Sequence, residues 1–243
     1  MSVVLGGCSV YRTYKRPDVA VIDSLYRQQI SPADSVASIA DLSWKELFTD
    51  PHLQKLIETG LCNNSDLGIA RLRAEEAEAL LQSARLSYLP SISLSPQGTI
   101  GKVEHSKTTK SYDLATSASW EIDIFGKLTN TKREARVVLE QSEAYRQAVQ
   151  TQLIATIANS YYTLLMLDEQ LNISRRTARN WSENLRVMKA LKNAGQTTDM
   201  AVAQTEASKL SVDASLLSLE RQITELENTL LSLLGSVPGD ITR

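Results

Sequence analysis

The side chains best suited to chemistry are two acidic residues near the middle of the chain and two histidines. Glu121 and Asp123 are two positions apart in a strand-like segment, so both are expected on one face. Paired carboxylates suit acid–base catalysis, although we favour a polar face in contact with water. His52 and His105 lie on separate elements without metal-ligand spacing. No HExxH, P-loop or nucleophile-elbow pattern is present, so we expect no catalytic residue, no metal and no cofactor.

The two cysteines, Cys8 and Cys62, are too few for a disulfide framework. Leu5-Gly6-Gly7-Cys8 resembles the lipobox of bacterial lipoproteins, in which a signal peptide is cut before a cysteine that is then acylated. We therefore expect lipid attachment at Cys8; the alternative is a chance cysteine near the N-terminus. Residues 1–8 lack the basic and apolar regions of a signal, so we expect a truncated one. Cys62 is expected to be a small, partly buried apolar residue.

Composition favours long helices. The 243 residues include only 10 Gly and 6 Pro, and 5% are aromatic. With 26 basic against 28 acidic residues, the net charge of −2 gives no footprint for nucleic acid, so no such partner is expected. No stretch of about 18 apolar residues occurs, which argues against a membrane-spanning helix.

The N-terminal part is expected to contain an extended arm followed by helices. Residues 9–42 show no sustained period, which is typical of an arm that wraps a surface. Residues 43–89 are expected to form short helices and a first long helix, with Pro51 in a first turn and Asn64-Ser65-Asp66 at a helix start. Pro90 is expected to end that helix.

Residues 90–126 change to a period of two, which predicts a β-hairpin. Apolar and polar side chains alternate from Ser91 to Ile100 and again from Leu114 to Ile124, with a polar loop between. A hairpin alone is marginal in water. Strands of about 10 residues with one apolar face also suit an outer-membrane barrel. A soluble hairpin that covers a helix bundle is the alternative. Because two strands cannot close a barrel, the barrel hypothesis requires further strands.

Residues 127–235 are expected to form a helical hairpin. No Gly or Pro occurs from 127 to 194, and apolar residues step by three and four from Leu164 to Met188. Gly195 breaks the helix, Thr197 or Thr198 can cap the next one, and a second seam runs from Val212 to Leu233. The short connection makes the helices antiparallel. Residues 236–243 are expected to begin a linker.

Several segments, in order along the chain, resemble the first half of the TolC-like outer-membrane efflux channels of the lipoprotein (NodT/OprM-type) branch. Residues 120–128, Trp-Glu-Ile-Asp-Ile-Phe-Gly-Lys-Leu, carry the most specific match. The other matching segments are Trp44–Leu53, Asn63–Leu67, Leu89–Ile92 and Leu230–Gly235. The resemblance implies a mainly α fold with a transmembrane β-hairpin, as one ββαα repeat of a protomer that has two.

The resemblance also implies partners and a location. The family forms homotrimers in which twelve strands make an outer-membrane barrel and long helices make a periplasmic tunnel. A periplasmic adaptor and an inner-membrane pump deliver the cargo, and Cys8 would anchor the protein in outer-membrane lipid. One repeat supplies half of the strands that a protomer needs, so the sequence is expected to be an N-terminal fragment. A hexamer of half-length chains is the alternative.

Site residues follow from the same resemblance. Trp120 and Phe125 are expected at the membrane interface, with Glu121 and Asp123 on the water side. Pro90 and Gly126 are expected as helix–strand hinges. The adaptor-docking tip is expected at Gly195, Gln196, Thr197, Thr198 and Asp199. The family usually has an aspartate six residues after the tip glycine, whereas this chain has Ala201, which puts a gating role of this repeat in doubt.

Two functions are weighed. The first is a passive export conduit for drugs or other small solutes in a tripartite efflux system. The second is a non-transport periplasmic coiled-coil scaffold or adaptor. An adaptor normally carries Gly-rich β-barrel modules, which the sequence lacks, so we favour the conduit.

Overall fold

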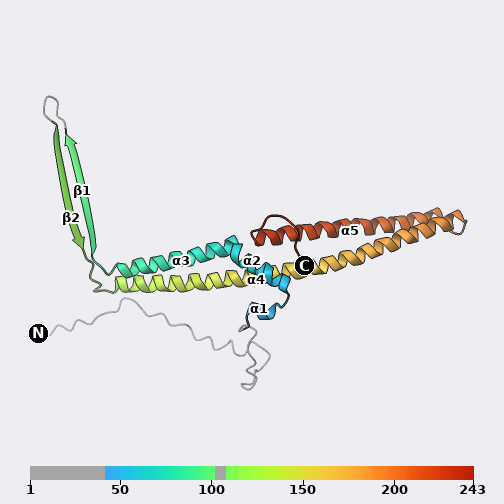
Figure 1. Cartoon of the computed structure of the whole chain (residues 1–243), viewed down its shortest axis with the longest axis horizontal. Coiled ribbons are helices and arrows are strands. Elements are labelled where there is room, and N and C mark those ends of the chain that lie inside the picture. The colour runs from blue at the N-terminus through green and yellow to red at the C-terminus, as the bar shows by residue number, and fades with distance from the viewer. Residues whose placement is uncertain (1–41, 102–107) are drawn as a thin grey trace, which may run out of the picture. The chain divides into compact units, whose positions relative to one another are not determined.

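The computed structural model describes residues 42–101 and 108–243; Cys8, His105 and nearly all of the expected arm lie outside them. Five helices and two strands follow one another (Figure 1): α1 (Trp44–Leu47), α2 (Pro51–Asn63), α3 (Ser65–Leu86), β1 (Ser91–Gly101), β2 (Thr109–Ser119), α4 (Lys127–Asn193) and α5 (Asp199–Leu233). Two compact units share them. Among the described residues, the first contains 71–101 and 108–145, and the second contains 42–70 and 146–243.

Side-chain caps begin the first two helices. Ser43 and Glu46 form a capping box on α1. Asp50 accepts a hydrogen bond from the backbone N–H of His52, and Pro51 occupies the first turn of α2. Asn64 then serves two helices, because it ends α2 and its side chain accepts from the N–H of Leu67 in α3. The helix starts expected from the sequence are confirmed.

The boundary before the hairpin lies slightly earlier than predicted. α3 ends at Leu86 rather than Leu89, and a tight turn follows in which the N–H groups of Tyr88 and Leu89 donate to carbonyls three residues back. Pro90 has no N–H to continue such a turn, and β1 begins directly after it.

The strands β1 and β2 pair antiparallel, and their register separates two faces. Ser91 lies opposite Ser119 and Ser93 opposite Ser117, while Ile92 lies opposite Ala118 and Leu94 opposite Thr116. Polar residues therefore face mainly polar ones across the pair. The alternation predicted from the sequence is confirmed.

The predicted bounds of the second strand are wrong. β2 covers 109–119 rather than 114–124. Because β1 begins at Ser91 and pairs there with Ser119, the residues after Ser119 have no partner in β1 with which to continue the ladder. Trp120, Glu121 and Asp123 consequently lie in the connection to α4.

The helical hairpin has the predicted form. α4 is a single helix of 67 residues, about 100 Å at 1.5 Å per residue, and α5 runs back along its C-terminal part (Figure 1). The seam residues from Leu164 to Met188 and from Val212 to Leu233 are buried or half-buried. Arg175 of α4 also pairs with Glu220 of α5 at 2.9 Å.

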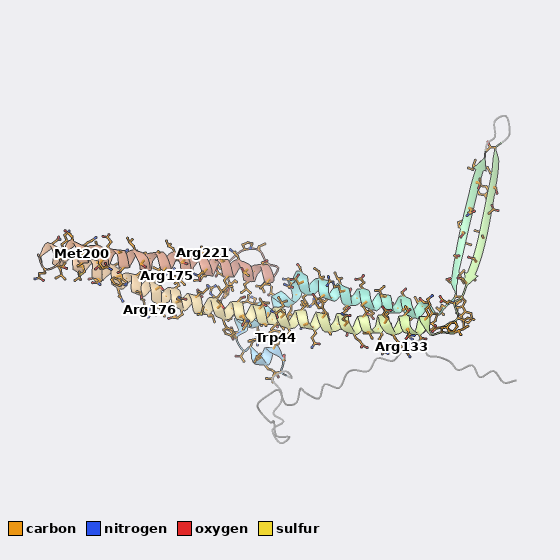
Figure 2. All side chains as sticks on the ribbon, turned by 180° about the vertical axis from the view of Figure 1, so that it is seen from behind. Trp44, Arg133, Arg175, Arg176, Met200 and Arg221 are labelled. Atoms are coloured by element: carbon orange, nitrogen blue, oxygen red, sulfur yellow. The ribbon has the colours of Figure 1, made fainter. Side chains whose placement is uncertain are left out.

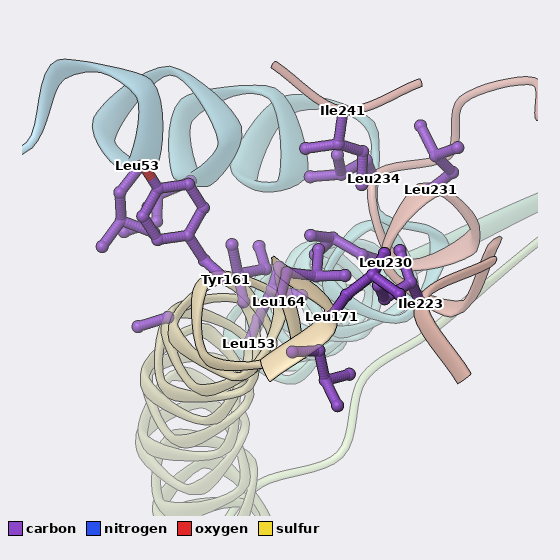
Figure 3. Close-up of a cluster of buried hydrophobic side chains, with 14 of the residues drawn as sticks. Leu53, Leu153, Tyr161, Leu164, Leu171, Ile223, Leu230, Leu231, Leu234 and Ile241 are labelled. Carbon is purple, nitrogen blue, oxygen red and sulfur yellow. The ribbon is translucent and has the colours of Figure 1, made fainter. Parts of the chain in front are cut away.

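The hydrophobic core of the second unit joins residues of α2, the start of α3, α4 and α5 with the C-terminal segment (Figure 3). Leu53 of α2, Tyr161 and Leu164 of α4 and Leu230 of α5 are almost completely buried, and Ile241 packs against the same cluster. The mainly helical fold with one antiparallel hairpin is confirmed. Within the described ranges, no helix has the length and apolar character to cross a membrane.

Candidate functional site

The connection between β2 and α4 is organised by Asp123. One carboxylate oxygen accepts from the N–H of Leu128 at 2.9 Å, and the other accepts from the N–H and hydroxyl of Thr129 at 2.9 and 2.6 Å. The hydrogen bond from the Thr129 side chain, together with the backbone N–H groups, lowers the pKa of Asp123. Asp123 therefore stays ionised and satisfies free N–H groups at the start of α4.

Glu121 and Asp123 do not form a catalytic pair. Glu121 accepts a hydrogen bond from Lys127 at 2.8 Å, and this contact raises the pKa of Lys127. Asp123 instead binds the first turn of α4. Because neither residue lies on a strand, the expectation that both share a strand face is wrong. The two carboxylates act separately as local structural contacts.

The two expected hinges have distinct physical roles. Pro90 separates the turn after α3 from β1. Gly126 adopts φ of 75°, and a Cβ added there would approach the amide nitrogen of Asn130 at 3.4 Å. That positive φ suits glycine. Asn130 reinforces the turn, because its side chain donates to the carbonyl of Gly126 at 2.6 Å.

Large apolar side chains are exposed around this connection. Trp120 is 64% exposed and Phe125 is 81% exposed, although the indole N–H of Trp120 donates to the carbonyl of Tyr88 at 3.1 Å. Ile122 and Ile124 are also exposed. The apolar face of the hairpin thus continues into a cluster of apolar side chains at the strand ends, and soluble proteins rarely expose apolar patches of this kind.

The opposite face of the hairpin carries paired hydroxyls. The side-chain oxygens of Ser91 and Ser119 lie 2.8 Å apart, and those of Ser93 and Ser117 lie 2.7 Å apart. Every described side chain on both strands is exposed. The hairpin therefore has a hydrophilic face, which also carries Asp113 opposite Gln97, and an apolar face that has no partner within the described part of the chain.

The turn between α4 and α5 is the second candidate site. Gly195 adopts φ of 74°, and the N–H groups of Gly195 and Gln196 donate to the carbonyls of Lys192 and Leu191 in a Schellman arrangement. Thr198 caps α5 by accepting from the N–H of Ala201 at 3.3 Å.

The rest of this turn is exposed to solvent apart from the half-buried Thr197. Asp199 is the first residue of α5 and forms an ion pair with Lys192 of α4. Met200 is 80% exposed at this end of the helical hairpin (Figure 2). The five expected tip residues are therefore continuous: Gly195 to Thr198 form the turn, Thr198 caps α5, and Asp199 begins it.

An ionic cluster at the end of the sequence was missed by the sequence analysis. Arg243 donates two hydrogen bonds to Asp168 of α4, one of them at 2.8 Å, and another to Glu227 of α5 at 2.5 Å. These contacts raise the pKa of Arg243 and lower that of Asp168. The partners are separated by 75 and 16 positions, so no local pattern could have indicated them.

Of the two histidines, which the sequence places on separate elements without metal-ligand spacing, the structure describes only His52. His52 lies in the first turn of α2, where its backbone N–H binds Asp50, and His105 is not among the described residues. Within residues 42–101 and 108–243, no group of three or more His, Cys, Asp or Glu residues is placed to hold a metal ion.

The strand hairpin has two distinct faces and leads through a capped connection into a very long helical hairpin. This arrangement defines a class of protein, the TolC-like ββαα repeat. The chain belongs to the outer membrane efflux protein family, whose model matches residues 56–236. The family expected from the sequence is therefore confirmed.

Individual relatives agree with this assignment. The chain is 32% identical over 238 residues to the probable outer membrane lipoprotein SilC of Salmonella typhimurium, with 96% of this chain and 51% of SilC covered. It is 27% identical over 251 residues to the toluene efflux pump outer membrane protein TtgC of Pseudomonas putida, with 99% and 52% covered. The chain thus spans about half the length of the curated relatives it matches.

A solved structure matches over nearly the whole chain. The open state of the MtrE outer membrane channel of Neisseria gonorrhoeae superposes with a TM-score of 0.75 at 27% identity. The match covers 97% of this chain and 53% of that one. The likeness therefore extends to the strand hairpin and the helical hairpin together.

Proposed function

We propose that the chain is part of an outer-membrane channel of a tripartite efflux system and forms a passive conduit for small solutes from the periplasm to the outside. The observation that carries this proposal is the pairing register of β1 and β2, which gives the hairpin one apolar and one hydrophilic face. A barrel wall requires this pattern, with lipid on one side and water on the other. Family membership supports the same function.

The proposed assembly is a homotrimer in the full-length form. Unpaired strand edges are not stable in lipid, so the two strands need neighbours from other segments or copies. The relative SilC is about twice as long as this chain, which leaves room for the second repeat that the proposal requires. The proposed working partners are a periplasmic adaptor and an inner-membrane pump. The chain itself needs no catalytic group, since the pump supplies the energy.

Each expected site then has a proposed role. Cys8 carries lipid that anchors the protein in the outer membrane, and the helices lie in the periplasm. Residues 195–199 dock the adaptor, and the exposure of all of them except the half-buried Thr197 supports this role. Pro90 and Gly126 set the change from helix to strand and back. Trp120 and Phe125 contact the membrane interface, where their exposed rings would be favourably placed.

The adaptor hypothesis is not retained. The proteins that match nearly the whole chain are named as an outer membrane lipoprotein, an outer membrane protein of a toluene efflux pump and an outer membrane channel, and these names favour the conduit. The names of these relatives include a toluene pump. We assign no individual substrate to this chain and keep the class of small solutes.

Cysteine labelling of β1 tests the proposed barrel wall. Single cysteines replace Ile92 or Leu94 on the apolar face and Ser93 or Ser95 on the hydrophilic face, in a chain in which Cys8 and Cys62 are serine. Each variant is labelled with an environment-sensitive fluorophore after reconstitution into phospholipid vesicles. We expect a nitroxide attached to lipid to quench the labels at 92 and 94, and aqueous iodide to quench those at 93 and 95.

Alternate positions of one strand serve as controls for one another, because they share the same depth and backbone. Equal quenching of all four labels by iodide, with none by the lipid nitroxide, would mean that the hairpin lies in water and would overturn the conduit proposal.

A further inference from the structure

A basic pocket lies in the first unit, between the end of α3 and the start of α4. Its volume is about 760 Å³. Seven residues line it: Leu81, Arg85, Tyr88, Thr129, Lys132, Arg133 and Arg136. Figure 2 places Arg133 at the end of α4 next to the hairpin. Four of the lining residues are cations and none is acidic, so the pocket attracts an anion.

The positive charge of the pocket is largely uncompensated. Arg136 lies 3.7 Å from Glu140, but both side chains are at least 70% exposed, so the pair is weak. Among the residues that the structure describes, Arg85, Lys132 and Arg133 form no ion pair. Similar arginines elsewhere are neutralised, as Arg175 is by Glu220. The pocket thus concentrates cations that an external anion can neutralise.

The inner wall of the pocket is apolar and fixed in place. Leu81 is buried. The hydroxyl of Tyr88 donates to Thr129 at 3.1 Å, and the carbonyl of Tyr88 accepts from the indole of Trp120. Lys132 lies over the Tyr88 ring, with its Nζ 5.7 Å from the ring centre. An apolar wall beside a cationic rim suits a ligand that has both characters.

The position of the pocket indicates which ligand that is. Tyr88 lies three residues before β1 begins at Ser91, and its contact to Trp120 joins it to the end of β2. If the strands cross the outer membrane, the pocket lies at its periplasmic surface, so this step rests on the proposed function. At that level the abundant amphipathic anions are phospholipid headgroups.

We propose that this basic pocket binds the phosphate headgroup of an anionic glycerophospholipid of the membrane leaflet next to the helices. Arginine guanidinium groups bind phosphate oxygens with paired hydrogen bonds, and Arg85 and Arg133 approach from different helices. The glycerol and the first acyl carbons lie along Leu81 and Tyr88. Such a lipid would hold α3 and α4 together where the strands leave the membrane.

Vesicle binding tests the proposal. The full 243-residue chain is mixed with phosphatidylcholine vesicles with or without 30% phosphatidylglycerol, and bound protein is measured by flotation. The variant Arg85→Gln/Arg133→Gln is compared with Arg179→Gln/Lys189→Gln, which removes two exposed charges from α4 outside the pocket. We expect the pocket variant to lose about 25-fold in the phosphatidylglycerol-dependent partition coefficient, about fivefold for each charge near the surface. The control variant should lose less than about twofold.

The remaining outcomes are decisive. Equal losses in both variants would mean general charge attraction and would overturn the proposal, as would no loss in either. Inorganic phosphate or glycerophosphoglycerol in solution should compete only weakly; full displacement at millimolar concentration would assign the pocket to a free phosphate ligand instead. Helical circular dichroism of each variant controls for folding. The cysteine labelling of β1 is independent of these charges, so failure of the conduit is distinguishable from failure of the pocket.

Discussion

Two aspartates, Asp50 and Asp123, each use one carboxylate for two contacts. The carboxylate accepts from backbone N–H groups at the start of a helix and also accepts from a hydroxyl group. Asp50 accepts from the N–H of His52 and, through its other oxygen, from the hydroxyl of Tyr161 at 2.7 Å. Asp123 combines backbone and hydroxyl donors in the same way. Burial together with the Asp50 contact raises the pKa of Tyr161 to about 12. At the residue scale, charge is used to position elements.

Removal of one hydroxyl tests the Asp50 contact. Tyr161 is 1% exposed, so Tyr161→Phe keeps its packing but loses the hydrogen bond to a charged acceptor. We expect a loss of about 1.5 kcal/mol in the free energy of unfolding, measured in urea by circular dichroism. The neighbouring Tyr162 is 48% exposed, and Tyr162→Phe should change stability by less than about 0.5 kcal/mol. Equal effects would contradict the assignment.

The Asp168–Arg243 contact should make stability depend on acid. Arg243 lowers the pKa of Asp168 below its ordinary value of 3.8. The stabilisation is therefore fully present above about pH 4 and is lost as the pH falls through the lower folded-state pKa. We expect Asp168→Asn to cost about 1 kcal/mol at pH 7, a figure reduced for the 38% exposure of the Asp168 side chain.

Urea unfolding between pH 7 and pH 2 measures this difference. The deficit of Asp168→Asn should shrink toward zero at pH 2. Asp240→Asn, at an exposed position near the same end of the chain, is the control and should follow the unaltered protein throughout. A deficit that persists unchanged at pH 2 would mean that the carboxylate charge is not responsible.

At the scale of elements, glycines end both helices of the hairpin. Gly195 after α4 and Gly235 after α5 have positive φ. Each glycine and the residue after it donate backbone hydrogen bonds to the last turn of the preceding helix, in the same pattern at both helix ends. Gly235 is also confined, because a Cβ there would lie 2.8 Å from the carbonyl oxygen of Asn63. The end of α5 is thereby fixed to the α2–α3 corner, where Asn64 donates to the carbonyl of Leu233 at 2.9 Å.

One substitution at two glycines should have opposite effects. Gly195→Ala places a Cβ in a left-handed residue and is expected to cost about 1 kcal/mol in thermal or urea unfolding. Gly68 lies within α3 with no heavy atom within 4 Å of an added Cβ, so Gly68→Ala should stabilise by about 0.5 kcal/mol. An added Cβ has no heavy atom within 4 Å at either position, so destabilisation by Gly68→Ala as well would contradict the assignment of the difference to backbone conformation.

The contact between α2 and α4 permits a double-mutant cycle. A Cβ on Gly60 would lie 2.5 Å from the Cδ1 atom of Ile157, so Gly60→Ala should cost about 2 kcal/mol by overpacking. Ile157→Val removes Cδ1 and costs about 1 kcal/mol alone. The double variant should be more stable than the sum predicts, by about 1 kcal/mol in urea unfolding. Simple additivity would mean that the two side chains do not meet.

At the scale of the whole molecule, the two units rely on different stabilisation. The second unit contains the continuous core around Tyr161 and Leu230. In the first unit, every described side chain of β1 and β2 is exposed, and the sheet has two strands only. A two-stranded sheet of this kind is marginal in water, so the hairpin depends on its surroundings for stability.

Hydrogen exchange should show this difference directly. In water, peptides from residues 91–101 and 109–119 should exchange their amides within seconds, because local opening costs almost nothing. Peptides from residues 157–171 should stay protected. Addition of phospholipid vesicles should slow exchange of the hairpin at least tenfold and leave the helical core unchanged. Exchange of the hairpin that does not respond to vesicles would contradict its insertion.

Local sequence patterns predicted the helices and strands well. They could not predict contacts between segments that are distant in the sequence. The seam from Leu164 to Met188 and the break at Gly195 follow from periodicity and backbone chemistry, so both were predictable. The end of β2 was not, because it depends on the position of Pro90 across the sheet. The basic pocket brings Arg85 together with residues more than 40 positions later. Spacing along one element cannot reveal such a cluster.

The paired serines have a consequence for anything that passes along their face. In the Ser91–Ser119 and Ser93–Ser117 pairs, either oxygen can be the donor. Each pair can therefore reverse its polarity by hydroxyl rotation alone, without displacement of a heavy atom. A solute that needs a hydrogen-bond donor and one that needs an acceptor can therefore bind the same serine pair in the same way. If this face lines the conduit, its serine pairs do not favour hydrogen-bond donors over acceptors. Discrimination between cargoes then depends on other parts of the pathway.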